Sequence, residues 1–317
     1  MSPRTLPILI LAALALAGLA WWLWFKPRQP DAGAVAAAYA TPLPPREGPL
    51  SVYHLGHSLV GRDMPAMLAQ LGGAGHSYAL QLGWGTSLKE HWEPGLEING
   101  FEAENDTPHF RPAREAIGSG DYDAVVLTEM VELRDAIKYH DSARYLSKWA
   151  DLARGGSDET RVYLYETWHR LDDPEGWLSR LDSDPETLWK NKLLLPDLAA
   201  GGATRPIRVI PAGQVIAAVV RAVEAAGGVD NITGRDDLFA RDEAGGVDKI
   251  HLGDLGTYLV ALTHYAVLYG RSPEGLPRQL TRADGSAATA PGPEAARLMQ
   301  RIVWQTVAAN PMTGVRQ

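Results

Sequence analysis

The sequence predicts an α/β fold in which a five-stranded, mostly parallel sheet lies between two layers of helices. From residue 50 onward, short apolar runs alternate with amphipathic stretches. Strands that are apolar on both faces and separated by helices are typical of parallel sheets, because the connecting helices cover both sides. A chain of 317 residues, of which 45% are hydrophobic, is long enough to bury such a core.

The first element along the chain is an uncharged apolar segment from Thr5 to Phe25. As a helix, this segment would span about 31 Å, which is enough to cross the hydrocarbon core of a bilayer. The tryptophans of "WWLW" near its end suit an interfacial aromatic belt. We therefore expect residues 1–26 to form a transmembrane anchor. A signal peptide cleaved near "AVAAAYA" (34–40) is the alternative.

A Pro- and Ala-rich stretch, "PRQPDAGAVAAAYATPLPPREGP" (27–49), follows the apolar segment. It shows no stable apolar period, and proline clusters stiffen a chain without folding it. We interpret it as a tether. The globular domain is then expected to cover residues 50–317.

Five apolar runs in this domain predict strands, at residues 50–56, 77–83, 123–129, 161–167 and 206–212. The stretches between and after them predict helices, near residues 63–73, 110–118, 141–154, 186–200, 213–226, 253–270 and 292–309. No Gly-x-Gly-x-x-Gly sequence follows the first strand, which argues against a dinucleotide-binding fold.

Composition excludes several classes of function. The formal net charge is −8, whereas a nucleic-acid-binding protein would carry a basic stripe. The chain has no cysteine, so disulfides, thiolate metal sites and a cysteine nucleophile are excluded.

His54 and His57 are three residues apart on a predicted strand and point to opposite faces, which does not suit a shared metal. We expect neither a metal nor a cofactor.

Ser58 in "VYHLGHSLVGRD" directly follows the first predicted strand. Ligands of open α/β sheets bind at the carboxyl ends of the strands, where Gly85, Glu129 and Trp168 are also expected to lie. Ser58 is therefore a candidate nucleophile. The alternative is an ordinary helix N-cap, a position where serine is common.

A serine nucleophile needs a base and a group that orients the base. Asp248 and His251 are three residues apart in a predicted loop before an apolar helix, so one short segment can present both. The alternative is a helix-capping aspartate beside a solvated histidine. Gly83 and Gly85 in "LQLGWGTSL" would let a backbone N–H approach a reacting carbonyl, unless they form a simple turn.

Taken together, these residues resemble the SGNH (GDSL-type) hydrolase superfamily over roughly residues 50–275. "YHLGHSLV" is similar to its first block, with Ser58 as nucleophile and His57 where the family more often has Asp or Asn. "GWGTSL" is similar to the second block, with Gly85 as oxyanion donor. "VDKIHLGDLG" is similar to the last block, in which Asp248 and His251 complete a triad. The resemblance implies a three-layer flavodoxin-like sandwich.

The third block departs from the family pattern, because "DYDAVVLTEMVELRD" (121–135) lacks the usual asparagine. The hydroxyl of Thr128 could replace its amide as an oxyanion donor. Thr167 and Trp168 after the fourth strand resemble an atypical bacterial branch with GHS in place of GDS, which makes Trp168 a candidate binding residue.

The resemblance implies a serine esterase that hydrolyses small acyl esters, acetyl in particular, on cell-envelope carbohydrate. Tryptophans near the strand ends could stack on sugar rings. The alternatives are an acyltransferase of the same fold, or a catalytically degenerate carbohydrate-binding module. The anchor would hold the domain at the cell membrane on the extracytoplasmic (periplasmic) side, and cleavage of the segment would release it as a secreted protein.

Overall fold

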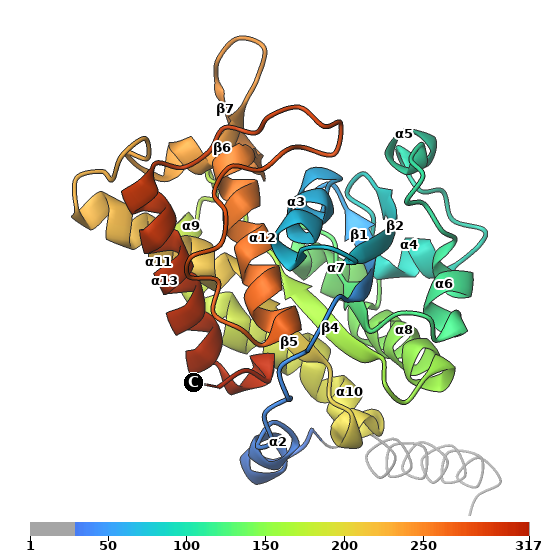
Figure 1. Cartoon of the computed structure of the whole chain (residues 1–317). Coiled ribbons are helices and arrows are strands. Elements are labelled where there is room, and N and C mark those ends of the chain that lie inside the picture. Colours follow the sequence, from blue (N-terminus) through green and yellow to red (C-terminus); the bar gives the residue numbers. More distant parts are fainter. Residues whose placement is uncertain (1–28, 317) are drawn as a thin grey trace, which may run out of the picture.

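A single parallel sheet organises the protein, whose computed structural model describes residues 29–316 (Figure 1). Its strands are β1 (Ser51–His57), β2 (Ser77–Gly83), β3 (Ala124–Leu127), β4 (Arg161–Glu166) and β5 (Arg208–Pro211). They lie in the order β2-β1-β3-β4-β5, and every neighbouring pair is parallel. This is the strand order of flavodoxin-like sheets. All five strands predicted from the sequence are confirmed to within two residues at each end.

Helices cover both faces of the sheet. One face carries α3 (Asp63–Gly72), α9 (Trp177–Asp184), α11 (Ala212–Ala225), α12 (Asp254–Tyr269) and α13 (Pro293–Ala309). The other face carries α4 (Leu88–Trp92), α6 (Ala113–Ser119), α7 (Leu133–Tyr139), α8 (Ser142–Gly156) and the π-helix η1 (Pro185–Leu194). The helix predicted at 186–200 is divided, with α10 (Leu195–Ala200) following η1, and Pro196 lacks the N–H that would continue the helical bonding.

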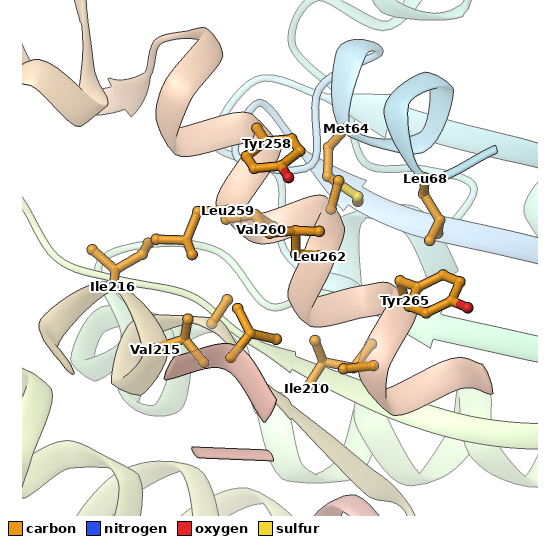
Figure 2. Packing of buried hydrophobic residues seen from close by; sticks show 14 of the residues in the cluster. Met64, Leu68, Ile210, Val215, Ile216, Tyr258, Leu259, Val260, Leu262 and Tyr265 are labelled. Carbon is orange, nitrogen blue, oxygen red and sulfur yellow. The ribbon is translucent and has the colours of Figure 1, made fainter. Parts of the chain in front are cut away.

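Within residues 29–316, each face of the sheet is covered by one large hydrophobic core. Successive strand residues alternate between them, so that Tyr163 and Tyr165 of β4 join one core while Val162 and Leu164 join the other. In the first core, α12 packs against β5, α3 and α11 (Figure 2), and it also contacts α13. Because neighbours surround it, α12 is apolar around most of its circumference instead of being amphipathic.

The segment predicted as a tether differs from that expectation where the structure describes it. Residues 32–38 form the short helix α2 (Ala32–Ala38), and the Tyr39 side chain is buried. The Tyr39 hydroxyl donates to the Ile207 carbonyl at 3.0 Å. Further hydrogen bonds hold the chain beyond Tyr39. The backbone N–H groups of Leu43 and Arg46 donate to the carbonyls of Gly314 and Tyr269, respectively. The guanidinium of Arg208 donates to the Thr41 carbonyl. The segment is thus packed along the amino edge of the sheet, near the starts of β4 and β5.

Several short elements were not predicted. The four helices α4, α5 (Phe101–Asn105), α7 and α9 have five to eight residues, too few for a clear helical period. Asp248 and His251, expected in a loop, lie on β7 (Val247–Leu252), which pairs antiparallel with β6 (Phe239–Arg241) in a separate hairpin.

The predicted transmembrane segment, residues 1–26, lies outside the described residues. Within residues 29–316, no helix is long and apolar enough to cross a membrane.

Candidate active site

Ser58 lies at the carboxyl edge of the sheet, immediately after the buried end of β1. A turn separates it from α3, whose N-cap is Arg62 and not Ser58. The N-cap alternative for Ser58 is therefore wrong. The Ser58 side chain is half-buried and is free to take part in interactions outside the helix.

The structure brings Ser58, His251 and Asp248 together. The Oγ of Ser58 lies 3.1 Å from Nε2 of His251, and Nδ1 of His251 lies 3.0 Å from Oδ2 of Asp248. Both distances are within the hydrogen-bonding range that general-base catalysis requires. The arrangement orients the imidazole with Nε2 toward the serine and Nδ1 toward the carboxylate.

Asp248 is itself held in place by the backbone of β7. Its Oδ1 accepts hydrogen bonds from the N–H groups of Ile250 at 2.7 Å and His251 at 2.8 Å. Burial alone would raise the pKa of Asp248, but these hydrogen bonds and the one to the His251 ring lower it below its ordinary value. Asp248 is therefore a carboxylate at neutral pH, as an orienting residue must be.

Trp168 supports the strand that carries His251. It is buried, and its Nε1–H donates to the Ile250 carbonyl at 2.7 Å. The backbone N–H of Leu171 donates to the Lys249 carbonyl at 2.8 Å, which is a second hydrogen bond between this segment and β7. Trp168 does not line the large cavity at Ser58. It lines a smaller cavity, of about 150 Å³, together with Ser58 and His251. Its hydrogen bond to Ile250 also positions β7.

A cavity of about 870 Å³ opens at Ser58 and His251. Gly85 lies on its wall with a φ of +58°, a conformation that glycine adopts without strain. No heavy atom outside the adjacent residues would lie within 4 Å of a Cβ added at Gly85, so its backbone is open to the cavity. Gly85 and Ser58 thus lie on the same cavity, as the prediction of an oxyanion donor at Gly85 requires.

Thr128 and Glu129 do not line this cavity. Thr128 is buried against Gly56: a Cβ added at Gly56 would lie 2.7 Å from the Cβ of Thr128. The Thr128 hydroxyl has no hydrogen-bond partner within the described part of the chain. Oε1 of Glu129 accepts from Leu88 N at 3.2 Å and from Met130 N at 2.9 Å. Burial raises the pKa of Glu129 to about 7. The predicted role of Thr128 as an oxyanion donor has no geometric support.

Two buried histidines that the sequence did not assign to the site hold the end of β1. Nε2 of His57 lies 3.0 Å from the Glu129 carbonyl, and its Nδ1 is 3.4 Å from Leu59 N. Nε2 of His91 lies 2.8 Å from the Gly56 carbonyl. Burial lowers the pKa of each to about 4, so both are neutral at pH 7. His91 lies on the short helix α4, which gave no periodic signal.

We expect His57 to make the protein less stable in acid. Its pKa is about 4 when folded and about 6.5 when unfolded, so the unfolded chain binds more protons between these values. Stability should therefore fall as the pH drops from 6.5 to 4. In His57→Gln, which keeps a donor for the Glu129 carbonyl, the melting temperature should depend less on pH over this range. If the melting temperatures of the wild type and His57→Gln changed equally with pH, His57 would not be the source of the acid sensitivity.

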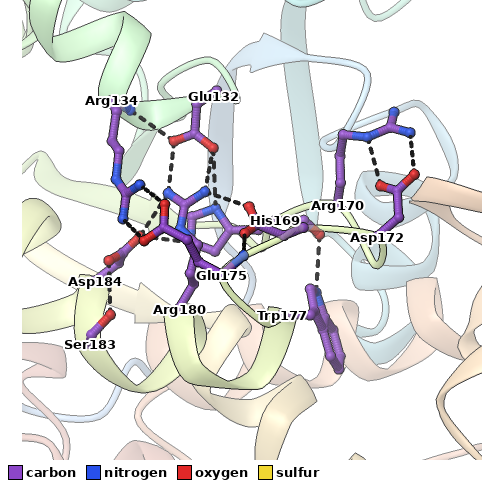
Figure 3. A network of polar contacts seen from close by, with 11 residues as sticks. Glu132, Arg134, His169, Arg170, Asp172, Glu175, Trp177, Arg180, Ser183 and Asp184 are labelled. Carbon is purple, nitrogen blue, oxygen red and sulfur yellow. Dashed lines mark hydrogen bonds and ion pairs between the residues drawn. The ribbon is translucent and has the colours of Figure 1, made fainter.

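A network of charged side chains, drawn in Figure 3, includes Glu132, which lines the cavity. The buried Arg180 contacts three carboxylates: Glu132 at 2.5 Å, Asp173 at 2.7 Å and Asp184 at 2.9 Å. Nε2 of His169 also lies 3.1 Å from Asp184. Partial burial would raise the pKa of Glu132, but the hydrogen bonds from Arg180 lower it to about 2. Glu132 and Asp173 line the cavity, so Arg180 fixes part of its shape.

Replacing Arg180 with methionine should lower the free energy of unfolding by about 3–5 kcal/mol, because it leaves buried carboxylates without their cation. Arg134 provides the matched control. It pairs with Glu175 near the surface, with 44% of its side chain exposed. Arg134→Met should cost less than about 1 kcal/mol. Equal urea midpoints for the two variants would show that the buried network does not stabilise the fold.

Comparison with known proteins finds similarity at the level of structure only. No sequence profile of a known family matches the chain, and no curated protein matches it. A crystal structure of a DUF4886 family protein from Bacteroides uniformis has 16% identity and a TM-score of 0.51, covering 81% of this chain and 94% of that one. A "putative GDSL-like lipase" from Parabacteroides merdae has 12% identity and a TM-score of 0.41, covering 71% and 97%. At these identities, the first similarity concerns the fold alone.

Proposed function

We propose that this protein is a serine esterase of the SGNH type. The observation that carries the proposal is the continuous set of contacts from Ser58 through His251 to Asp248 beside an open cavity. Ser58 meets the distant pair of His251 and Asp248 in the order that nucleophile, base and orienting carboxylate require.

In the proposed reaction, Oγ of Ser58 attacks the ester carbonyl carbon while Nε2 of His251 takes the hydroxyl proton. The tetrahedral intermediate collapses, the C–O bond to the alcohol breaks, and His251 returns the proton to the leaving oxygen. Water then repeats the sequence on the acyl-enzyme and releases the acid. Asp248 stabilises the imidazolium at both stages. The backbone N–H groups of Ser58 and Gly85 are the proposed oxyanion donors.

The lining of the cavity supports a short acyl group on a polar alcohol. Its aliphatic residues are few, namely Leu59, Val131, Pro174 and Ile250, and most of the others are polar or charged. A fatty chain would need a longer apolar channel to be removed from water. The exposed indole of Trp84 at the cavity supports a carbohydrate as the alcohol part.

Acyl-chain length should therefore decide turnover. For p-nitrophenyl esters, kcat/KM should be highest for acetyl, lower for butyryl, and at least about tenfold lower for octanoyl, a difference of about 1.4 kcal/mol in transition-state binding. All three esters share one leaving group, so the series isolates the acyl side. A tenfold advantage for octanoyl would replace the carbohydrate esterase with a lipase or thioesterase.

Two other functions use the same site. An acyltransferase results if a sugar hydroxyl captures the acyl-enzyme in place of water. A catalytically degenerate carbohydrate-binding module is favoured by one observation: neither Thr128 nor Glu129 of the third block lines the cavity to supply a side-chain oxyanion donor. Such a module would bind glycans and hydrolyse no ester.

The proposed location is the extracytoplasmic side of the cell membrane, through an anchor at residues 1–26. The segment from α2 to residue 46 packs at the amino edge of the sheet, whereas Ser58 lies at the carboxyl edge. An anchored domain would then open its cavity away from the membrane. The full chain should stay with membranes after an alkaline carbonate wash. A soluble product that begins near Ala40 would instead show a cleaved signal.

A further inference from the structure

Trp84 is an exposed aromatic side chain that nevertheless has a fixed position. Its side chain is 54% exposed at the cavity that contains Ser58. One side of the indole rests on Gly100, where an added Cβ would lie only 2.3 Å from the ring. The indole Nε1–H donates to Oε1 of Glu104 at 2.7 Å. An aromatic ring held in this way presents its surface to the cavity without losing freedom on binding a ligand.

The segment that carries Glu104 is also fixed. Arg62, just before α3, donates to the backbone carbonyl of Glu104 at 3.0 Å and to that of Ala103. The backbone N–H of Trp84 donates to Asn99 O at 2.7 Å. Among the described residues, the Glu104 carboxylate forms no ion pair, because Arg62 contacts only the backbone. Glu104 therefore places a negative charge at the edge of the indole.

The rest of the cavity lining is acidic as well. Glu132, Asp172 and Asp173 add three carboxylates, whereas Arg170 is the single guanidinium on the lining within the described chain. Arg170 is paired with Asp172 at 2.9 Å, and Arg180 compensates Glu132 and Asp173 from behind. Glu104 is thus the carboxylate on this wall that lacks a cation. An anionic ligand would be repelled there, and a cation would be attracted.

We propose that Trp84 and Glu104 form a subsite for a sugar ring that carries a protonated amine. The face of a tryptophan attracts a cation through its quadrupole, and the carboxylate at its edge attracts the same group. The proposal rests on the proposed function in that the subsite would hold the alcohol part of the ester. The new element is the charge of the sugar in the alcohol part. Rings that bear an amine bind best, uncharged rings bind more weakly, and uronic acids are excluded.

The test is a binding experiment that does not depend on turnover. The full chain carrying Ser58→Ala is titrated in detergent by calorimetry with tetramers of glucosamine, N-acetylglucosamine and galacturonic acid at pH 6.5. We expect the dissociation constant to rise in that order, by at least about tenfold from the first tetramer to the last. The difference should shrink in 0.5 M salt, because ions screen exposed charges.

Two variants locate the effect. Glu104→Gln should reduce the preference for the cationic tetramer to about threefold or less. Trp84→Ala should weaken binding of the glucosamine and N-acetylglucosamine tetramers. Glu274→Gln, an identical change at an exposed position outside the cavity, should leave the preference intact. Equal affinities for all three tetramers, or an unchanged preference in Glu104→Gln, would overturn the proposal. Failure of the esterase function would appear separately, as absent turnover of p-nitrophenyl acetate by the wild-type protein.

Discussion

Replacing Ser58 with alanine should lower kcat/KM for p-nitrophenyl acetate by at least about a thousandfold. The substitution removes the attacking oxygen and leaves only whatever acceleration binding and the oxyanion donors provide. Within residues 29–316, the one side-chain hydrogen bond of Ser58 is to His251, so the melting temperature should change little. The measurement is steady-state hydrolysis and thermal unfolding of the same preparations.

Ser119→Ala is a suitable control for this variant. The Ser119 hydroxyl donates to the backbone carbonyl of Ala116 in α6, and Ser119 does not line the cavity. This substitution should leave hydrolysis unchanged. If Ser58→Ala retained turnover similar to that of Ser119→Ala, Ser58 would not be the nucleophile.

His251→Ala should be about as inactive as Ser58→Ala, and the double variant should be no less active than either single one. Members of one catalytic unit give strongly non-additive losses, because each alone already disables the unit. Asp248→Asn should lose about 10⁴-fold, since the amide both fails to stabilise the imidazolium and favours the wrong tautomer. Losses that multiply in the Ser58→Ala/His251→Ala protein would show that the two residues act independently.

The strands of the sheet and the longer helices could be predicted from the sequence because their signals are local. The apolar run of β1 and the continuous apolar length of α12 are visible without tertiary information. The pairing of Asp248 with His251 was predictable for the same reason, since both lie within one short segment. The contact between His251 and Ser58, by contrast, joins residues 193 positions apart and followed only from the strand-end rule and the family resemblance.

The parts that could not be predicted depend on contacts between distant residues. Thr128 follows β3 as expected, but its side chain faces Gly56 inside the protein. The hydrogen bond from the Trp168 indole to the Ile250 carbonyl of β7 joins residues 82 positions apart, and no local signal indicated it. The packing of Tyr39 against Ile207 orders a stretch whose Pro- and Ala-rich composition resembles that of a free tether. Composition and spacing report neither the direction of a side chain nor its partner.

The central claim, that His251 activates Ser58, is tested most directly by covalent labelling. The full chain is treated with a fluorophosphonate probe, which reacts with activated serines, and the labelled peptide is identified by mass spectrometry. We expect one adduct, on Ser58, that is lost in Ser58→Ala and strongly reduced in His251→Ala. A correctly folded wild-type chain that carries no adduct on Ser58, or that is labelled only at another serine, would contradict the account.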